Sequence, residues 1–321
     1  MKKENLALVY PLGILKRYLK FYDEFLLNYL LPLRDELRIV IIAPCNEALD
    51  TIMDKYSRFG IETVLIPEAV DIWIRDWAPI PVHFSCGKSL YLKPEFKTSY
   101  YSGRYQSFEP LLSKASGKFT EYMDIRTIPL PLKTDGGNFA FNGKDTVVLT
   151  NRILENNQPL TKDEIRDIFK TCIGVENVIF IPVEKFDVTG HTDGMLRFID
   201  SETLAVGTYS LEFPMERKFM TNIADKIKEN LDGCVKIIRV ENFDMMDDEN
   251  YGIVPSASGN HMNFLKTGKH IFLPDYGIPS SAKSYETLKT HLTHYNIVRV
   301  PNKSLFQISK DGGVLNCITW N

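Results

Sequence analysis

The sequence predicts an α/β fold in which five similar modules form a closed ring. Two observations lead to this prediction. A short β-hairpin recurs every 52 to 67 residues, with copies that begin at Ala78, Asn138, Met195, Met262 and Val314. Between the copies lies a helix-like stretch followed by a strand, a unit that cannot bury both of its faces alone. An α/β sandwich with unrelated hairpins is the alternative.

The hairpins are predicted by apolar residues that alternate with polar ones around a turn. The stretch Asn138–Thr150 alternates on both sides of an Asn-Gly dipeptide, which is the strongest short-range hairpin signal. Similar alternation predicts hairpins at Ala78–Leu92, Met195–Gly207 and Met262–Pro274, and a truncated last copy at Val314.

Helices and further strands are predicted between the hairpins. Thr161–Glu164 has the spacing of a capping box and begins a helix that leads into a strand at Asn177–Ile181. A helix is also expected near Ser281–His294, followed by a strand at Tyr295–Val300.

Strands are also expected in the first part of the chain, at Ile39–Ile42 and Thr63–Ile66. The N-terminal stretch has a basic start and a short apolar run, but Pro11 and Gly13 interrupt this run and no small-residue cleavage site follows. A first β-strand is therefore favoured over a signal peptide. No apolar run approaches the roughly 20 residues that a membrane span requires.

Composition indicates a globular protein, and its net charge argues against nucleic acid and anionic membranes as partners. The 321 residues are 44% hydrophobic and 25% charged, and no linker or low-complexity segment divides them, so residues 1–321 are expected to form one domain. The net charge of −3 provides no excess of positive charge for binding nucleic acid or an anionic membrane. Neither partner is expected.

Five scattered cysteines favour reduced thiols. Their number is odd and no C-x-x-C pair is present, which argues against a disulfide framework and a thiolate zinc site. We therefore expect a cytoplasmic protein. The cysteines are Cys45, Cys86, Cys172, Cys234 and Cys317.

Polar motifs stand immediately before a hairpin or at its start. They are Trp73–Asp76, Asp135–Asn138, His191–Asp193 and Asp311–Cys317. Each is weak alone, since a Gly-Gly pair is usually a turn and a buried cysteine usually acts as a small hydrophobe. Equivalent positions of a closed ring converge on one axis, however, so the motifs are expected to meet there.

Together these motifs resemble the agmatine deiminase and bacterial peptidylarginine deiminase family of guanidino-group-modifying enzymes. The family pattern W-x-R-D-x-G-P, E-G-G-N, G-H-x-D and G-G-G-N-x-H-C is followed in order from about Asp71 to the end. The resemblance implies a five-module pseudo-symmetric α/β propeller of the pentein type. The chain departs from the pattern at Ala78, Asp135, Gly194, Asp311, Val314, Leu315 and Asn316.

The resemblance implies a catalytic role for five residues. Asp76 and Asp193 would bind the N–H edges of a planar guanidinium, and Cys317 as a thiolate would attack its central carbon. His191 would move protons to ammonia and from water, with Asp135 orienting its ring.

Substrate contacts are further expected from Trp73, Asn138 and Gly313. Arg75 is expected to hold acidic side chains in place. The aromatic-basic segment formed by Tyr100, Tyr101, Arg104 and Tyr105 is expected to be a surface loop, with a cover over the active-site mouth as the alternative. The acidic run Asp244–Glu249 is expected to be a solvated loop, with a part of the pocket rim as the alternative.

The expected activity is hydrolytic deimination of a small-molecule or peptidyl guanidino substrate to a ureido product and ammonia, with no metal or cofactor. Agmatine, free arginine and peptidylarginine all remain open as substrates. The alternatives are an amidinotransferase with the same cysteine chemistry and an inactive propeller that binds a cationic ligand. A homo-oligomer is compatible with the resemblance, and the residues do not decide it.

Overall fold

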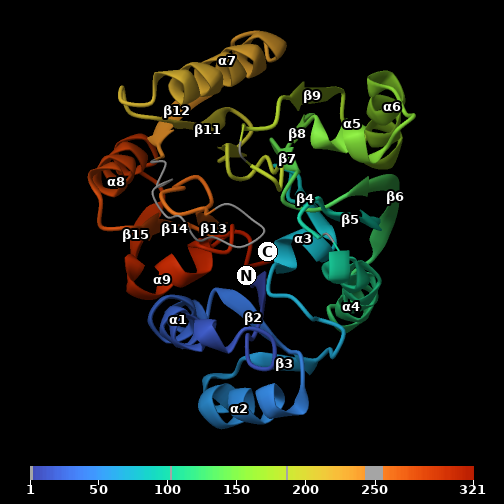
Figure 1. Cartoon of the computed structure of the whole chain (residues 1–321), viewed down its shortest axis with the longest axis vertical. Coiled ribbons are helices and arrows are strands. Elements are labelled where there is room, and N and C mark those ends of the chain that lie inside the picture. Colours follow the sequence, from blue (N-terminus) through green and yellow to red (C-terminus); the bar gives the residue numbers. More distant parts are fainter. Residues whose placement is uncertain (1–2, 102, 186, 243–255) are drawn as a thin grey trace.

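The strands of the computed structural model form five three-stranded sheets. The structure describes residues 3–101, 103–185, 187–242 and 256–321, so the acidic run 244–249 lies outside the described residues. Figure 1 shows the sheets around a common centre, with both ends of the chain near that centre and helices on the outside. Within the described residues the sheets stay separate, and no strand pairing closes them into one sheet.

Four of the sheets share one topology, and all four hairpin predictions that fall on them are confirmed. In each, the first strand is antiparallel to the second and the third is parallel to the second. The sheets are β4–β6 (Ile80–His83, Ser89–Phe96, Thr127–Thr134), β7–β9 (Ala140–Phe141, Thr146–Thr150, Asn177–Ile181), β10–β12 (Leu196–Phe198, Thr203–Thr208, Lys236–Glu241) and β13–β15 (Leu265–Thr267, His270–Asp275, Asn296–Pro301).

Helices connect the parallel strands of these sheets, because parallel neighbours need a crossover connection. The predicted capping box is confirmed: the Glu164 N–H donates to the Thr161 hydroxyl, and the Thr161 N–H donates to the Glu164 carboxylate at 2.7 Å. The helix expected near Ser281 begins slightly earlier, at a proline. The crossover helices are α4 (Phe108–Tyr122), α5 (Arg152–Asn156), α6 (Lys162–Ile173), α7 (Pro214–Asn230) and α8 (Pro279–His291).

The first sheet differs, because its three strands are all parallel. They are β1 (Glu4–Val9), β2 (Leu37–Ala43) and β3 (Glu62–Leu65), so the predicted N-terminal strand is confirmed. Helix α1 (Leu19–Phe25) and short helical turns connect β1 to β2, and α2 (Asn46–Tyr56) connects β2 to β3.

The expected hairpin at Val314 is wrong. Residues 315–318 form a turn after helix α9 (Asn302–Ser309), and in this closing segment only Trp320 makes a β-bridge. That bridge is antiparallel to Ala7 of β1, with N–H···O distances of 2.8 and 2.9 Å. In the other four sheets a local hairpin supplies the antiparallel neighbour. In the first sheet this neighbour is Trp320, from the other end of the chain.

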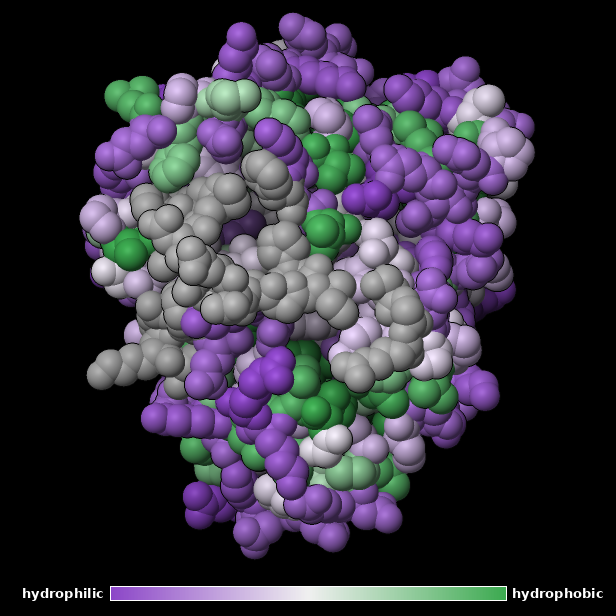
Figure 2. All heavy atoms as spheres, in the orientation of Figure 1, coloured by the Kyte–Doolittle hydropathy of each residue, from purple (hydrophilic) through white to green (hydrophobic). Residues whose placement is uncertain are grey.

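Apolar side chains anchor this closing segment. Trp320 is fully buried, packs edge-on against Phe119 with ring centroids 5.0 Å apart, and donates its indole N–H to the Pro79 carbonyl at 2.7 Å. Figure 2 shows hydrophilic residues over the outer helices, such as α7 at the top. No helix among the described residues is long and apolar enough to cross a membrane.

Candidate active site

The four polar motifs meet near the centre of the molecule, as predicted. Asp76 lies in the short helix α3 (Ile74–Trp77), Asp135 follows β6, His191 precedes β10, and Cys317 lies in the closing C-terminal segment. Three backbone hydrogen bonds link these segments: Gly136 N–H to the Asp76 carbonyl (3.2 Å), Asp193 N–H to the Gly137 carbonyl (3.1 Å) and Arg75 N–H to the Cys317 carbonyl (3.1 Å).

His191 lies between two buried carboxylates. Its Nε2 is 3.1 Å from Asp135 Oδ1, and its Nδ1 is 3.9 Å from Asp76 Oδ1. Each of the three residues is at most 4% exposed. The imidazole and the carboxylates are therefore shielded from water, where charge interactions are strong.

Burial and neighbouring charges shift the pKa values of this cluster. Burial, with the charges of Asp135 and Asp193, raises the pKa of Asp76 to about 8 against the opposing effects of His191 and a Tyr100 hydrogen bond. Burial lowers the pKa of His191, but the carboxylates of Asp135, Asp76 and Asp193 raise it well above its usual value. The imidazole is thus held in its protonated form at neutral pH, ready to act as an acid.

A glycine makes this close approach possible. A Cβ atom at Gly137 would lie 2.3 Å from His191 Nδ1 and 2.8 Å from Asp76 Oδ1, which is closer than non-bonded atoms approach. Gly136 is equally constrained, since a Cβ there would lie 2.1 Å from the Arg75 carbonyl oxygen. The Gly-Gly pair is thus more than a turn, because its backbone occupies space beside the reactive groups.

The Cys317 thiol lies in a polar niche and is 6% exposed. Its Sγ is 3.2 Å from Asn263 Nδ2 and 4.0 Å from Asp193 Oδ2. Asn263 Oδ1 also accepts from the backbone N–H groups of Asn316 (3.1 Å) and Cys317 (3.3 Å). Burial raises the pKa of the thiol well above its usual value, with Asp193 and Asp76 adding to the increase.

We predict that Asn263→Asp makes Cys317 less reactive. A carboxylate at this contact adds a negative charge beside Sγ and removes an N–H donor, and both changes raise the thiol pKa. One pKa unit would lower the alkylation rate at neutral pH by about tenfold. The measurement is iodoacetamide labelling of the Cys317 peptide, followed by mass spectrometry across pH. Asn230→Asp at the exposed end of α7 is the matched control, and equal rates in both variants would contradict the prediction.

Asn316 connects the thiol segment to the substrate-binding candidate Asp193. Its Nδ2 donates to Asp193 Oδ2 at 2.6 Å. At this position the family pattern has a histidine, so the asparagine preserves a polar contact without adding a titratable group. Asp311, another departure, pairs with Arg17 at 2.5 Å, in a partly exposed ion pair.

The other expected substrate contacts lie around the same centre. The Asn138 N–H donates to Asp135 Oδ1 at 3.1 Å, and Asn138 Oδ1 accepts from Thr150 N–H and the Thr192 hydroxyl, both at 2.8 Å. These bonds fix the segment that carries Asp135. In the closing segment, a Cβ at Gly313 would lie 2.4 Å from Cζ3 of the partly exposed Trp73, so the indole packs directly on the Gly313 backbone.

Two contacting residues were not among the predicted site residues. One is Asn263. It could have been found, because Gly259–Asn263 lies immediately before a hairpin or at its start, as the other polar motifs do. The second is Tyr100, for which the surface-loop expectation is wrong. Tyr100 is buried, donates its hydroxyl to Asp76 Oδ2 at 2.8 Å, and packs edge-on against His191.

Tyr100→Phe is expected to lower kcat/KM by about tenfold, since a hydrogen bond to a charged group contributes about 1.5 kcal/mol. The Tyr100 hydroxyl lowers the pKa of Asp76, so its loss moves the acidic limb of the pH–rate profile upward. Steady-state ammonia release across pH measures both effects. Tyr285→Phe is the control, and an unchanged acidic limb in Tyr100→Phe would refute the coupling.

The expectation that Arg75 holds acidic side chains is wrong as to its contacts. Its Nη2 donates to Asn321 Oδ1 at 2.6 Å and its Nε to the Asn316 carbonyl at 3.4 Å. Among the described residues no carboxylate oxygen lies within ion-pair distance of this guanidinium. Arg75 therefore supports the backbone of the closing segment.

A metal ion is one conceivable occupant of the carboxylate cluster. Ligand atoms of Asp76, Asp135 and His191 all lie within 4.8 Å of one another. Metal ligation requires a neutral imidazole, whereas the carboxylates raise the pKa of His191.

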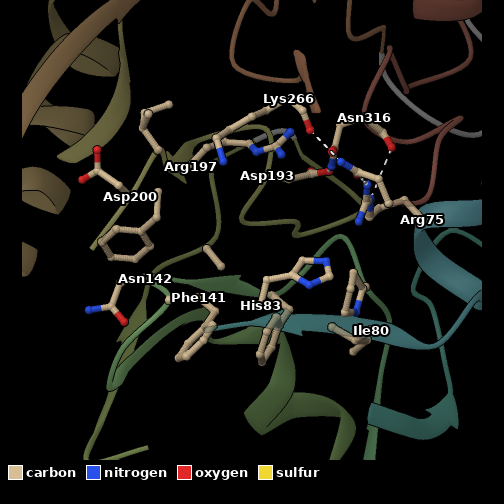
Figure 3. A pocket seen from close by; sticks show the side chains of 18 of the residues that line it. Arg75, Ile80, His83, Phe141, Asn142, Asp193, Arg197, Asp200, Lys266 and Asn316 are labelled. Carbon is tan, nitrogen blue, oxygen red and sulfur yellow. Dashed lines mark hydrogen bonds between the residues drawn. The ribbon is translucent and has the colours of Figure 1, made fainter. Parts of the chain in front are cut away.

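A cavity of about 350 Å³ lies on the other side of Asp193 and Asn316. Arg75, Arg197 and Lys266 also line it, and Figure 3 shows their side chains near Asp193. Cys317 and His191 are not among its lining residues. The cavity is thus adjacent to the cluster of reactive groups and distinct from it.

Comparisons with known proteins agree with this geometry. The model of the family described as Porphyromonas-type peptidyl-arginine deiminase matches residues 5–321. The agmatine deiminase of Pseudomonas syringae is 26% identical over 276 residues, covering 78% of this chain and 73% of that protein.

Solved structures are similar over nearly the whole chain. A C. jejuni agmatine deiminase with substrate bound has a TM-score of 0.79 at 17% identity, covering 100% of this chain and 93% of that one. An Enterococcus faecalis agmatine deiminase has a TM-score of 0.76 at 16% identity, with 99% and 92% covered. The fold is therefore the α/β fold of these proteins, of the pentein type.

Proposed function

Because the chain belongs to the Porphyromonas-type peptidyl-arginine deiminase family, we propose that it hydrolyses a guanidino substrate to a ureido product and ammonia. It is a hydrolase of the deiminase class, acting on C–N bonds. The observation that carries the proposal is the buried Cys317 thiol, 4.0 Å from Asp193 Oδ2, a carboxylate that also acts on the pKa of His191. The deiminase names of the relatives favour hydrolysis over amidino transfer.

We further propose that the five sheets are the blades of one pseudo-symmetric propeller and that residues 1–321 form a single domain. The shared strand order of four sheets supports this interpretation. The Ala7–Trp320 bridge supports it as well, because it completes the first blade with the last segment. Such a ring explains why motifs more than 200 residues apart, such as Asp76 and Cys317, reach one centre.

In the proposed first step, the guanidinium lies between the carboxylates of Asp76 and Asp193. Its positive charge neutralises the two acids that raise the thiol pKa, so Cys317 releases its proton to solvent when the substrate binds. The thiolate attacks the central carbon and forms a C–S bond. The C–N bond then breaks, and His191 donates a proton to the departing ammonia.

In the second step, water hydrolyses the covalent amidino intermediate. His191, now neutral, takes a proton from the water as its oxygen attacks the same carbon. The C–S bond breaks, the ureido product leaves, and the thiol is restored. Asp135, 3.1 Å from His191 Nε2, stabilises the imidazolium at the beginning and end of the cycle.

The proposed substrate class is a small guanidino cation of the agmatine or arginine type. Relatives with the name agmatine deiminase support it, and the acid cluster suits a cationic head group. An agmatine substrate would connect the reaction to putrescine formation.

The test is ammonia release from agmatine, free arginine and an arginyl peptide, with the ureido product identified by mass spectrometry. At least one substrate is expected to turn over, and a chelator should leave the rate unchanged. Absence of ammonia from all three, or complete inhibition by chelator, would refute the proposed function.

A further inference from the structure

The cavity behind Asp193 contains three basic side chains from three sheets or their connections. Arg75 comes from α3, Arg197 from β10 and Lys266 from β13, and all three line the same space of about 350 Å³. Figure 3 shows Arg197 and Lys266 on one wall and Arg75 beside Asp193 and Asn316. The proposed reaction uses none of these three side chains.

These cations have no ion-pair partner at close range. Within the described part of the chain, none of the three lies within 4.0 Å of a carboxylate oxygen, although sixteen such pairs occur elsewhere. Arg197 Nη1 donates only to the Phe264 carbonyl at 2.6 Å, and Lys266 Nζ lies 5.7 Å from the Tyr295 ring centroid. Like charges gathered in a shielded space destabilise one another unless an anion joins them.

The pKa shifts agree with this mutual repulsion. Burial and, after it, the positive charge of Arg75 lower the pKa of Arg197 to about 10, against opposing contributions from Asp193 and Cys317. Burial likewise lowers the pKa of Lys266, with a further decrease from Arg197, while the charges of Glu4 and Asp200 raise it. The three positive charges therefore affect one another across the cavity.

Three carboxylates also line the cavity, and among the described residues none of them lies within 4.0 Å of the three cations. Glu4 accepts from the Gly268 N–H at 2.5 Å and from the Asn321 amide at 3.2 Å. Asp200 is exposed, and Asp193 is bonded to Asn316. A guanidinium bound at Asp193 would offset that charge and leave the cavity walls with an excess of positive charge.

The rest of the lining is largely aromatic and apolar. Phe84 and Phe141 stand edge to face with ring centroids 5.1 Å apart, and Phe198 and Ile199 also line the cavity. The exposed His83 also lines the cavity, which therefore reaches the surface. A volume of this size accommodates a small ligand that combines an apolar body with a polar head.

We propose that this cavity is a second binding site, for a small organic carboxylate with a flat apolar body. Arg75, Arg197 and Lys266 surround its carboxylate, since guanidinium groups match that planar, two-oxygen geometry. The aromatic wall covers the apolar body. The site is separate from the guanidino site and shares only the partition formed by Asp193 and Asn316. The excess of positive charge on its walls rests on the proposed function, because it requires a guanidinium at Asp193.

Benzoate is the probe, and the uncharged benzamide is its matched control. A saturation-transfer NMR titration of the full chain is expected to show benzoate binding at least about tenfold more tightly than benzamide. Raising the salt concentration should weaken benzoate alone. Equal affinities for the two compounds, or no binding of benzoate, would overturn the proposal, and this comparison requires no variant.

Lys266→Gln should weaken benzoate binding by about tenfold, because it removes one of the three charges. Lys269→Gln is the control, since Lys269 is exposed in the adjoining β13–β14 turn and does not line the cavity. Thermal unfolding checks that both variants fold. Equal loss in both variants, or no loss in Lys266→Gln, would contradict the assignment.

Competition establishes whether the two sites are separate. In the presence of saturating agmatine, with Cys317→Ala to prevent turnover, benzoate affinity is expected to stay equal or to increase, because a guanidinium beside Asp193 adds positive charge. A loss of more than about tenfold would show that both ligands occupy one site and would overturn the inference.

Discussion

Cys317→Ala is expected to lower ammonia release by at least about 10³-fold and to leave the fold intact. Loss of a nucleophile removes the covalent route entirely, and the remaining binding groups supply only a small residual rate. The thiol is buried but small, so its removal costs only about 1 kcal/mol of stability. Steady-state ammonia release and thermal unfolding measure the two quantities.

The control for this variant is Cys86→Ala, which removes an exposed thiol far from the carboxylate cluster. Its rate should equal that of the wild type. Comparable activity in Cys317→Ala and Cys86→Ala would rule out Cys317 as the nucleophile. A fall in both would indicate that general thiol loss, and not one site, reduces the rate.

Gly137→Ala is expected to reduce kcat by about 10²-fold or more. The added methyl group would lie 2.3 Å from His191 Nδ1, so the imidazole or the strand end must move by around 1 Å. Displacements of this size cost about 10²-fold where reacting groups must be aligned. The effect should appear mainly in kcat, because the ring that transfers protons is displaced.

Gly117→Ala is the matched control, because a Cβ there meets only the flexible end of Lys93 at 3.5 Å. Gly117 lies within α4, where alanine favours the helix, so stability should rise slightly. If Gly137→Ala retained full activity, the close packing of Gly137 on His191 would have no part in catalysis.

Local patterns predicted the elements that depend on neighbouring residues. The hairpin at Asn138–Thr150 was predictable because alternation and an Asn-Gly turn act within a few residues. The same holds for the helix after Thr161, where the capping hydrogen bonds join residues three apart. In both cases the residues that determine the structure lie within the hairpin or helix that they predict.

Contacts between distant residues were not predictable in this way. The Val314 segment has the start of a hairpin, but its antiparallel neighbour is Ala7, at the other end of the chain. Tyr100 has the composition of a surface loop, and only its position against Asp76 and His191 makes it part of the site. Such contacts depend on how separate elements pack.

In the candidate site, too, some features were predictable from the sequence and others were not. Motif order placed Asp76, Asp135, His191, Asp193 and Cys317 near one centre because equivalent ends of similar modules converge. The positions where this chain departs from the family pattern gave no indication of their contacts. Asn316 proved to bind Asp193, and Asp311 an exposed arginine.

The charges around Cys317 determine when its thiolate forms, and no sequence motif predicts this. In the free protein, burial and the carboxylates of Asp193 and Asp76 keep the Cys317 thiol protonated at neutral pH. A cation bound between these acids removes that obstacle, so the nucleophile forms only when a guanidinium is present. This coupling would protect the thiol from unrelated electrophiles.

The central claim is that Cys317 carries the amidino group during turnover. The direct measurement is rapid acid quenching of the wild-type enzyme with its best substrate, followed by mass spectrometry of the peptides that contain each cysteine. We predict an amidino adduct on Cys317 alone, formed and lost as fast as ammonia appears. Turnover without any adduct on Cys317, or an adduct on another cysteine, would contradict the mechanism.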